Sequence, residues 1–230
     1  MRLTIRHRYD FGDDSGLVGD DLVRAEAWDA LRTQSRGAFA LATDRGALED
    51  QARARPELAL RAAEIATIAR MRGVSSLASY GAGTGLLEHC LSRLLPGVRL
   101  TLTEYAPATA ERLAQLLPEA DVRQHDLRRD VPVPSELHLF HRIDTELGNR
   151  EWRGVYSRFA AVPILVVATE VIGGADVRRE LLSRARGRTN GTRAGLARNR
   201  EAFESLWRRS HTARPLLVSD LRGWLLEPRA

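Results

Sequence analysis

The stretch Leu77-Ala-Ser-Tyr-Gly81-Ala-Gly83-Thr-Gly85-Leu-Leu-Glu88 decides how the fold is interpreted. Residues 74–80 form a short, mostly apolar run that predicts a strand, and residues 84–95 have the pattern of a helix. Glycines at alternate positions let the backbone turn sharply and pass close to a bound molecule. The first N–H groups of the helix are also available to a ligand. The stretch therefore predicts a strand, a ligand-binding loop and a helix, with a tight turn that binds nothing as the alternative.

Two common ligands of glycine loops do not fit this spacing. A dinucleotide-binding loop has glycines at its first, third and sixth positions. Counted from Gly81, the sixth position is Leu86, which disfavours NAD and FAD. The phosphate-binding loop of nucleoside triphosphatases requires a lysine after its last glycine. The chain contains no lysine at all.

Strand-like and helix-like stretches alternate beyond the glycine loop. Further strands are expected at 98–104, 121–125, 136–141 and 163–169, and helices at 107–117 and 149–161. Strands separated by helices pair in parallel through right-handed crossovers, with helices on both faces of the sheet. The last two strands, 215–219 and 223–227, are too close in sequence for a crossover helix. The expected fold is α/β: a Rossmann-like, mostly parallel seven-stranded sheet that ends in a C-terminal antiparallel hairpin.

The N-terminal part of the chain has a different character. Residues 1–55 are polar, with Gly-Asp clusters that favour turns and a helix expected at 22–31. Pro56 suits the first turn of a second helix, at 57–71. We expect residues 1–55 to form a helical cap or lid to which Trp28, Tyr9 and His7 contribute, and residues 56–230 to form the main domain. A cap that only shields the sheet fits the pattern equally well.

The glycine stretch resembles the first motif of the class I S-adenosylmethionine-dependent methyltransferases. That motif reads acid-x-Gly-x-Gly-x-Gly, and residues 79–85 contain its three glycines. The resemblance covers residues 57–227 and implies a methyltransferase that binds S-adenosylmethionine and releases S-adenosylhomocysteine. Ser79 stands where the family has Asp or Glu, the residue that holds the amino-acid end of the cofactor, and serine brings no charge to that place. The resemblance implies cofactor contacts from Ser79, Tyr80, Gly81, Ala82, Gly83 and Gly85.

The second and third strands each end in an acidic residue or are followed by one. Glu104 ends the second strand, where its carboxylate would lie beside the glycine loop and accept both hydroxyls of a ribose. Tyr105 would lie against the adenine ring. The resemblance implies that Asp126 takes the exocyclic amine of adenine and that the backbone of Leu127 reads the ring edge. A solvated Glu104 and an Asp126 that only caps a turn are the alternatives.

The fourth strand carries the reacting centre in this family. His141 is the first candidate for a general base because imidazole titrates near neutral pH, and Asp144 and Glu146 are the next candidates. His141 and Arg142 are also expected to contact the cofactor. A structural histidine bonded to the backbone is the alternative for His141. The stretch lacks the Asn-Pro-Pro-Tyr type of motif of amino-methylating nucleic-acid enzymes, which favours a small-molecule O or N acceptor.

Composition leaves the acceptor open. No apolar run is long enough to span a membrane, and neither a secretory signal nor a pair of cysteines is present, so a cytoplasmic protein is expected. No cluster has metal-ligand spacing, so no metal is expected. All 35 basic residues are arginines, and ten of them lie between Arg178 and Arg209, a segment expected to be an interrupted helix. That segment makes an RNA methyltransferase an alternative, and Ser79 makes a non-catalytic cofactor-binding or scaffold protein another. The sequence does not indicate an oligomeric state.

Overall fold

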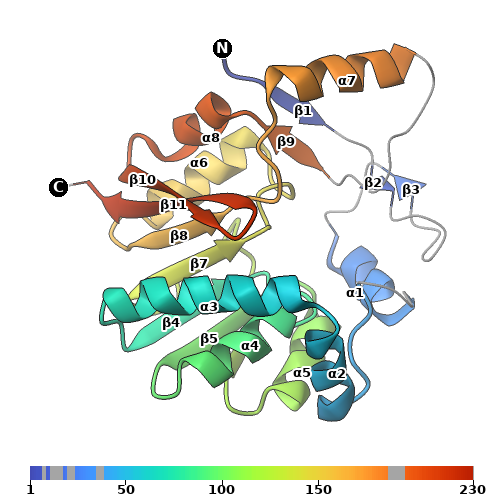
Figure 1. Ribbon diagram of the computed structural model, residues 1–230, viewed down its shortest axis with the longest axis vertical. Helices are drawn as coiled ribbons and strands as arrows, with labels where there is room; N and C mark the ends of the chain where they lie inside the picture. The colour runs from blue at the N-terminus through green and yellow to red at the C-terminus, as the bar shows by residue number, and fades with distance from the viewer. Residues whose placement is uncertain (7–8, 11–17, 20–23, 35–38, 186–194, 230) are drawn as a thin grey trace.

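A seven-stranded sheet forms the centre of the protein in the computed structural model, which describes residues 1–6, 9–10, 18–19, 24–34, 39–185 and 195–229 (Figure 1). The strands lie in the order β10-β11-β8-β7-β4-β5-β6. Neighbouring strands from β8 to β6 pair in parallel, whereas β11 pairs antiparallel with both β8 and β10. The expected mostly parallel sheet with a C-terminal hairpin is therefore confirmed. The strands are β4 (Ser76–Tyr80), β5 (Arg99–Glu104), β6 (Asp121–Gln124), β7 (Leu137–His141), β8 (Ile164–Val167), β10 (His211–Val218) and β11 (Leu221–Pro228).

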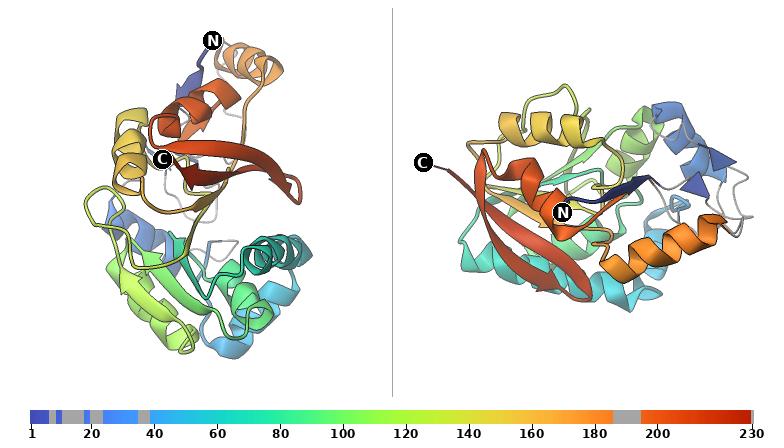
Figure 2. Two further views of the ribbon diagram at one scale, coloured as in Figure 1. Left: turned by 90° about the vertical axis from the view of Figure 1, so that its left-hand side faces the viewer. Right: turned by 90° about the horizontal axis from the view of Figure 1, so that it is seen from above.

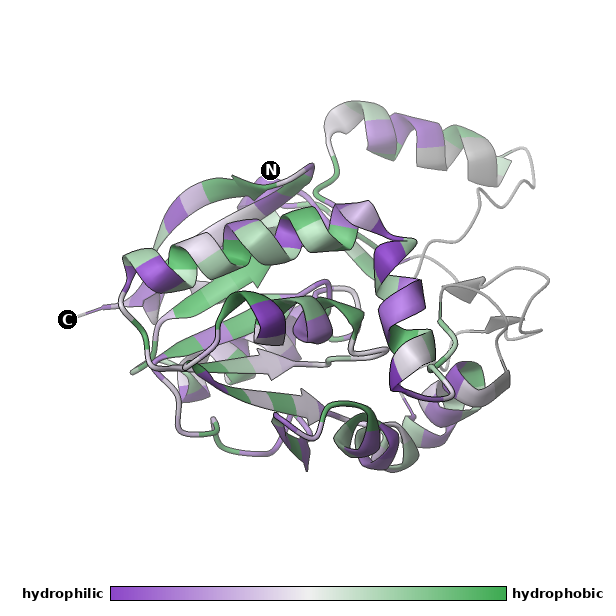
Figure 3. Cartoon of the chain, turned by 60° about the horizontal axis from the view of Figure 1, so that its bottom comes forward, coloured by the Kyte–Doolittle hydropathy of each residue, from purple (hydrophilic) through white to green (hydrophobic). Residues whose placement is uncertain are grey.

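Helices cover both faces of the sheet, as the two further views show (Figure 2). Every residue of β4 is buried, and alternate residues belong to different cores. Leu77 packs with the helices of one face, and Ala78 and Tyr80 pack with those of the other. The strands differ in how apolar they are, as the hydropathy colouring shows (Figure 3). Strand β8 is apolar on both sides, as suits a parallel strand between two helical layers, whereas β5 alternates Leu100 and Leu102 with Thr101 and Thr103. The first face carries α2 (Arg45–Arg53), α3 (Pro56–Met71), α4 (Leu86–Leu94) and α5 (Pro107–Leu116), and the second carries α6 (Asn149–Arg158) and α8 (Arg200–Trp207).

Helix α1 (Ala25–Gln34) lies at the end of the sheet to which the parallel strands point (Figure 1). Asp29 of α1 accepts hydrogen bonds from the backbone N–H groups of Ala108 and Thr109 at distances of 3.2 and 2.9 Å. These N–H groups belong to the first turn of α5, where a carboxylate is favourable. The α1 helix was expected three residues earlier, and α2 was not expected.

The basic segment 176–209 is not a single interrupted helix. Helix α7 (Gly174–Ala185) is followed, after residues 186–194 outside the described part, by strand β9 (Leu196–Arg198). This strand pairs antiparallel with β1 (Thr4–Arg6), so the N-terminal residues and the segment before α8 form a small second sheet. A third pair joins β2 (Tyr9–Asp10) to β3 (Val18–Gly19). Two- and three-residue strands carry too little periodic pattern to be recognised in a sequence, which is why they were missed.

None of the helices in the described ranges has the length and apolar character that crossing a membrane would require.

Candidate active site

The glycine loop follows β4 and takes backbone conformations that favour glycine. Gly81 and Gly83 have positive φ angles of 67° and 61°. A Cβ atom on Gly81 would lie 2.6 Å from Cγ2 of Ile143, and one on Gly83 would lie 2.7 Å from a guanidinium nitrogen of Arg32. Both the backbone and the close packing therefore select glycine. Because Ile143 follows β7 and Arg32 belongs to α1, the loop lies where three parts of the chain meet.

Glu104 converges on the glycine loop. One carboxylate oxygen, Oε2, accepts the N–H of Gly83 at 2.8 Å, and the other, Oε1, accepts those of Tyr105 at 2.9 Å and Ala106 at 3.3 Å. Only 7% of the residue is exposed, so the carboxylate is held in a fixed position at the carboxyl edge of the sheet. A carboxylate can accept about four hydrogen bonds, and these three leave capacity for a ligand hydroxyl.

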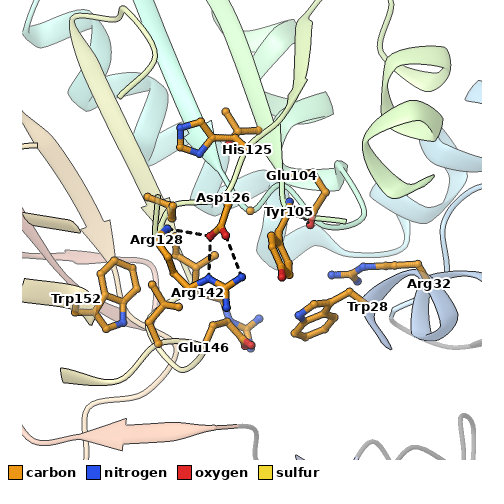
Figure 4. A pocket seen from close by; sticks show the side chains of 15 residues that line it. Trp28, Arg32, Glu104, Tyr105, His125, Asp126, Arg128, Arg142, Glu146 and Trp152 are labelled. Atoms are coloured by element: carbon orange, nitrogen blue, oxygen red, sulfur yellow. Dashed lines mark hydrogen bonds and ion pairs between the residues drawn. The ribbon is translucent and has the colours of Figure 1, made fainter. Parts of the chain in front are cut away.

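A first cavity of about 160 Å³ opens beside Glu104 (Figure 4). Its walls include Glu104, Tyr105, Asp126, Leu127, Arg128 and Trp152, together with Trp28 and Arg32 of α1. Arg128 lies over the ring of Tyr105, 4.8 Å from the centroid, and holds both oxygens of Asp126 at 2.9 and 3.0 Å. The Asp126 carboxylate is thus already paired, and the Tyr105 ring already has a cation on one face.

A second cavity of about 590 Å³ adjoins the first and shares five lining residues with it: Trp28, Arg32, Gly81, Arg142 and Glu146. It continues along the glycine loop and reaches β7 and β8. Several of the side chains that line this part are polar. These further residues include Ala82, Gly83, Glu88, His141, Thr145 and Thr169. The two cavities meet at the glycine loop, so a ligand lying along the loop would extend into both.

His141 lies in the second cavity as an uncharged imidazole. Burial, assisted by the nearby cations Arg142 and Arg61, lowers the pKa of His141 to about 3. Its Nε2 has no hydrogen-bond partner among the described residues. A neutral ring can accept a hydrogen bond, but with so low a pKa it is a weak base at neutral pH. The role of general base for His141 stays a prediction, and the geometry favours a hydrogen-bond acceptor.

Asp144 and Glu146 occupy different surroundings. Asp144 is 4% exposed and lines neither of the two cavities. Its Oδ1 accepts hydrogen bonds from the backbone N–H and the hydroxyl of Thr169 at 2.7 and 2.8 Å. Glu146 lines both cavities. The catalytic roles of both residues stay predictions; the contacts of Asp144 are those of a residue that positions Thr169.

The remaining predicted residues fall into two groups. Ala82, Gly83, Leu127 and Arg142 line a cavity, and their contacts with a cofactor stay predictions. Ser79 is fully buried and donates a hydrogen bond to Glu88 at 2.7 Å. Tyr80 points into the aromatic core behind the sheet, where its hydroxyl accepts the N–H of Val133 at 3.1 Å. Only the backbone of Tyr80 can therefore serve the loop.

Of the residues suggested for the lid, Trp28 lines both cavities, His7 lies outside the described residues, and only the backbone of Tyr9 is described.

Several residues at the site had no sequence signal. Arg32 stacks on Trp28 and Phe39, with 5.5 and 5.9 Å between its guanidinium and the ring centroids. Burial lowers the pKa of Arg32, an effect that the carboxylates of Glu104 and Glu146 oppose. Glu88 lies within the predicted helix at 84–95, and its position in the sequence does not indicate that it is buried. No group of metal-ligating side chains occurs among the residues that the structure describes.

Among known proteins, the chain resembles solved structures over most of its length. No protein-family model and no curated protein sequence matches this chain. The solved structure of the mitomycin 7-O-methyltransferase MmcR is similar with a TM-score of 0.59 and 18% identity, covering 91% of this chain and 74% of that one. An O-methyltransferase family protein from Burkholderia thailandensis gives 0.60 and 13%, covering 90% and 63%. Human N-acetylserotonin methyltransferase, solved in complex with S-adenosylmethionine, gives 0.56 and 15%, covering 81% and 57%.

These likenesses establish the fold. The chain has the Rossmann-like fold of the class I S-adenosylmethionine-dependent methyltransferases, as the glycine motif predicted. It spans only 57% of the human structure and 74% of MmcR.

Proposed function

We propose that this protein binds S-adenosylmethionine and transfers its methyl group to an oxygen or nitrogen of a small-molecule acceptor. The convergence of the glycine loop with Glu104 carries the proposal, because Gly83 and the Glu104 carboxylate are joined at 2.8 Å beside a cavity. Two features of one ligand, a ribose and a chain passing along the loop, would account for that arrangement.

The first cavity suits the adenosine part of the cofactor. Glu104 would accept the ribose hydroxyls with its remaining hydrogen-bonding capacity. Tyr105 and Leu127 offer flat and apolar surface to a purine ring. Asp126 would receive the exocyclic amine only by sharing its carboxylate with Arg128, which holds it now.

The second cavity suits the amino-acid end of the cofactor and the acceptor. S-adenosylmethionine supplies a methyl group already activated on a sulfonium, so the protein has mainly to position the acceptor and exclude water. Thr169, held by Asp144, and the imidazole of His141 are polar groups that would orient an acceptor hydroxyl or amine. Glu146 lines both cavities and would take the acceptor's proton if one must leave.

The α1 helix supports the idea of a lid. Trp28 and Arg32 line both cavities from a segment outside the main sheet. Asp29 fastens the same helix to the first turn of α5. Residues 1–55 would in this way close the site over a bound cofactor while the main domain, 56–230, supplies the rest.

The described arginines of the basic segment differ in whether an RNA phosphate could reach them. Arg198 is fully buried, Arg200 pairs with Glu204 at 2.7 Å, and Arg179 lies 3.5 Å from Asp176. Arg198 is therefore out of reach of phosphates, whereas Arg200 and Arg179 lie in exposed ion pairs that a phosphate could replace. Retention of the purified protein on RNA at low salt, lost steeply as salt rises, would instead favour the nucleic-acid alternative.

Isothermal titration with S-adenosylmethionine and with S-adenosylhomocysteine tests the proposal. Binding of both is expected, and Gly83→Val should abolish it while circular dichroism shows an intact fold. The proposal would be refuted if neither molecule gave heat on titration and equilibrium dialysis also detected no binding. Binding without methyl transfer to any member of a panel of phenols, catechols and amines would favour a non-catalytic protein.

A further inference from the structure

Glu88 is a buried acid whose presence the fold alone does not explain. It lies on α4, three residues after the glycine loop, and is 3% exposed. Ser79 is the one side chain that hydrogen-bonds to it in the described part of the chain, through Oγ to Oε1 at 2.7 Å. No arginine pairs with it among the described residues, and the charge of another acid, Glu104, raises its pKa further. A buried carboxylate without a cation is costly unless something else compensates its charge.

The surroundings of Glu88 indicate what would compensate it. Glu88 lines the second cavity together with Gly81, Gly83 and Arg32. That cavity thus has a carboxyl group at one place on its wall and a guanidinium, packed against Gly83, at another. An amino acid in its zwitterionic form carries the opposite charge for each of these groups.

The hydrogen bond to Ser79 connects Glu88 with the departure in the glycine motif. Position 79 has a serine where the methyltransferase motif has an acid. Here the serine hydroxyl donates to the carboxyl of Glu88, which approaches the same place from the adjoining helix. The acid missing from the strand is present nearby, supplied nine positions later in the sequence.

We infer that Glu88 receives the ammonium group of the amino-acid end of S-adenosylmethionine, with Ser79 as the residue that positions its carboxyl group. This assignment rests on the proposed function and adds a binding residue that the motif does not contain. Arg32 is the cation available for the carboxylate of the same zwitterion, from the α1 side of the cavity.

The test compares ligands with and without the amino-acid end. S-adenosylmethionine and S-adenosylhomocysteine carry that end, 5′-methylthioadenosine lacks it, and a deaminated analogue of S-adenosylhomocysteine lacks only the ammonium. Glu88→Gln should weaken binding of the first two ligands about tenfold or more, the size expected for a lost charge-assisted hydrogen bond. Binding of the last two should change less than threefold. Glu204→Gln, on α8 at the other face of the sheet, is the matched control and should change none of them.

A relocation variant adds a measurement that a purely structural role of Glu88 would not change. In the double variant Ser79→Asp with Glu88→Gln, the acid returns to the place where the motif has it. We expect this variant to recover at least half of the lost preference for S-adenosylhomocysteine over 5′-methylthioadenosine, on a logarithmic scale.

Each other outcome overturns the assignment. Equal weakening of all four ligands by Glu88→Gln would make Glu88 a structural residue, and unchanged affinity for S-adenosylmethionine would remove it from the site. Wild-type protein that binds 5′-methylthioadenosine but neither cofactor form would reject the assignment while leaving an adenosine site. Wild-type protein that binds none of the four would reject the proposed function and this assignment with it.

Discussion

Replacing Glu88 by Gln should change how the stability of the free protein depends on pH. Burial is the main cause that raises the pKa of Glu88 from 4.5 to about 7, against the lowering effect of the Ser79 hydrogen bond. The folded protein therefore keeps a proton on Glu88 over a range of pH in which the unfolded chain has lost it. The amide of Gln has nearly the same shape and does not titrate, so the variant removes only this dependence.

The sign and size follow from linkage. Below pH 4.5 the carboxyl is protonated in both states, and its contribution to stability is fully present. As pH rises from 4.5 to 7, only the unfolded state ionises, and wild-type stability falls by about 1.4 kcal/mol per pH unit from this group. The stability of Glu88→Gln relative to wild type should therefore rise by about 2.5 kcal/mol between pH 5 and pH 8. For a chain of this length that corresponds to a relative shift in Tm of roughly 5–10 °C.

The assay is thermal or urea unfolding of both proteins, followed by far-UV circular dichroism at half-unit steps from pH 5 to pH 8. Other buried groups, such as His141 and His138 with their lowered pKa values, titrate alike in both proteins and cancel in the difference. Glu204→Gln, which alters an exposed ion pair, should follow the wild-type curve. A difference between Glu88→Gln and wild type that stays constant within about 0.5 kcal/mol over this range would refute the burial of an uncompensated acid.

Four further predictions follow from the site and its supports. Gly83→Val should lower cofactor affinity by at least a hundredfold in titration calorimetry, because the side chain would meet Arg32 and the φ of 61° is unfavourable for a branched residue; affinity within threefold of wild type would contradict the loop assignment. Glu104→Ala should weaken binding of S-adenosylhomocysteine by roughly 1.5–3 kcal/mol through lost ribose hydrogen bonds, and unchanged binding would place the ribose elsewhere. Arg198→Met should destabilise the protein by about 3 kcal/mol in urea unfolding, because the backbone carbonyls of Asp144 and Leu147 lose a buried donor, whereas Arg200→Met, on the exposed ion pair with Glu204, should have little effect. Binding of S-adenosylmethionine at pH 6 should release close to one proton, measured by calorimetry in buffers of different ionisation enthalpy, since Glu88 must ionise to receive an ammonium; Glu88→Gln should release correspondingly less.

The sheet could be predicted because its signals are local. The central strands are short and bounded by turns or helices: β8 is apolar throughout because both of its sides are buried, and β5 alternates apolar and polar residues. The hairpin of β10 and β11 followed from the few residues between them. Strand β9 and helix α2 were not predicted, because the strand has only three residues and the helix is mostly polar.

The residues of the candidate site were predictable only where they belong to a strand end. The glycine loop and Glu104 both occupy the carboxyl edge of neighbouring parallel strands, and that topology brings them together whatever the side chains between them. The position of Arg32 depends on how α1 packs against α5 at the end of the sheet, which no periodicity in the first 55 residues encodes. Asp144 was a reasonable catalytic candidate by position, yet its contact with Thr169 depends on the turn that follows β7.

The serine at position 79 shows that the place of a charge in the folded structure matters more than its position in a sequence motif. The glycines are fixed by backbone geometry, and no other residue can take their place without steric conflict. The acid beside them needs only to deliver a carboxylate to a certain point, and a side chain from the adjoining helix can reach that point as well as one from the strand. Ser79 and Glu88 are joined through space although the whole loop separates them in sequence. A change that destroys the motif on paper can therefore leave its chemistry in place, and the decisive quantity is the ligand preference that this carboxyl group confers.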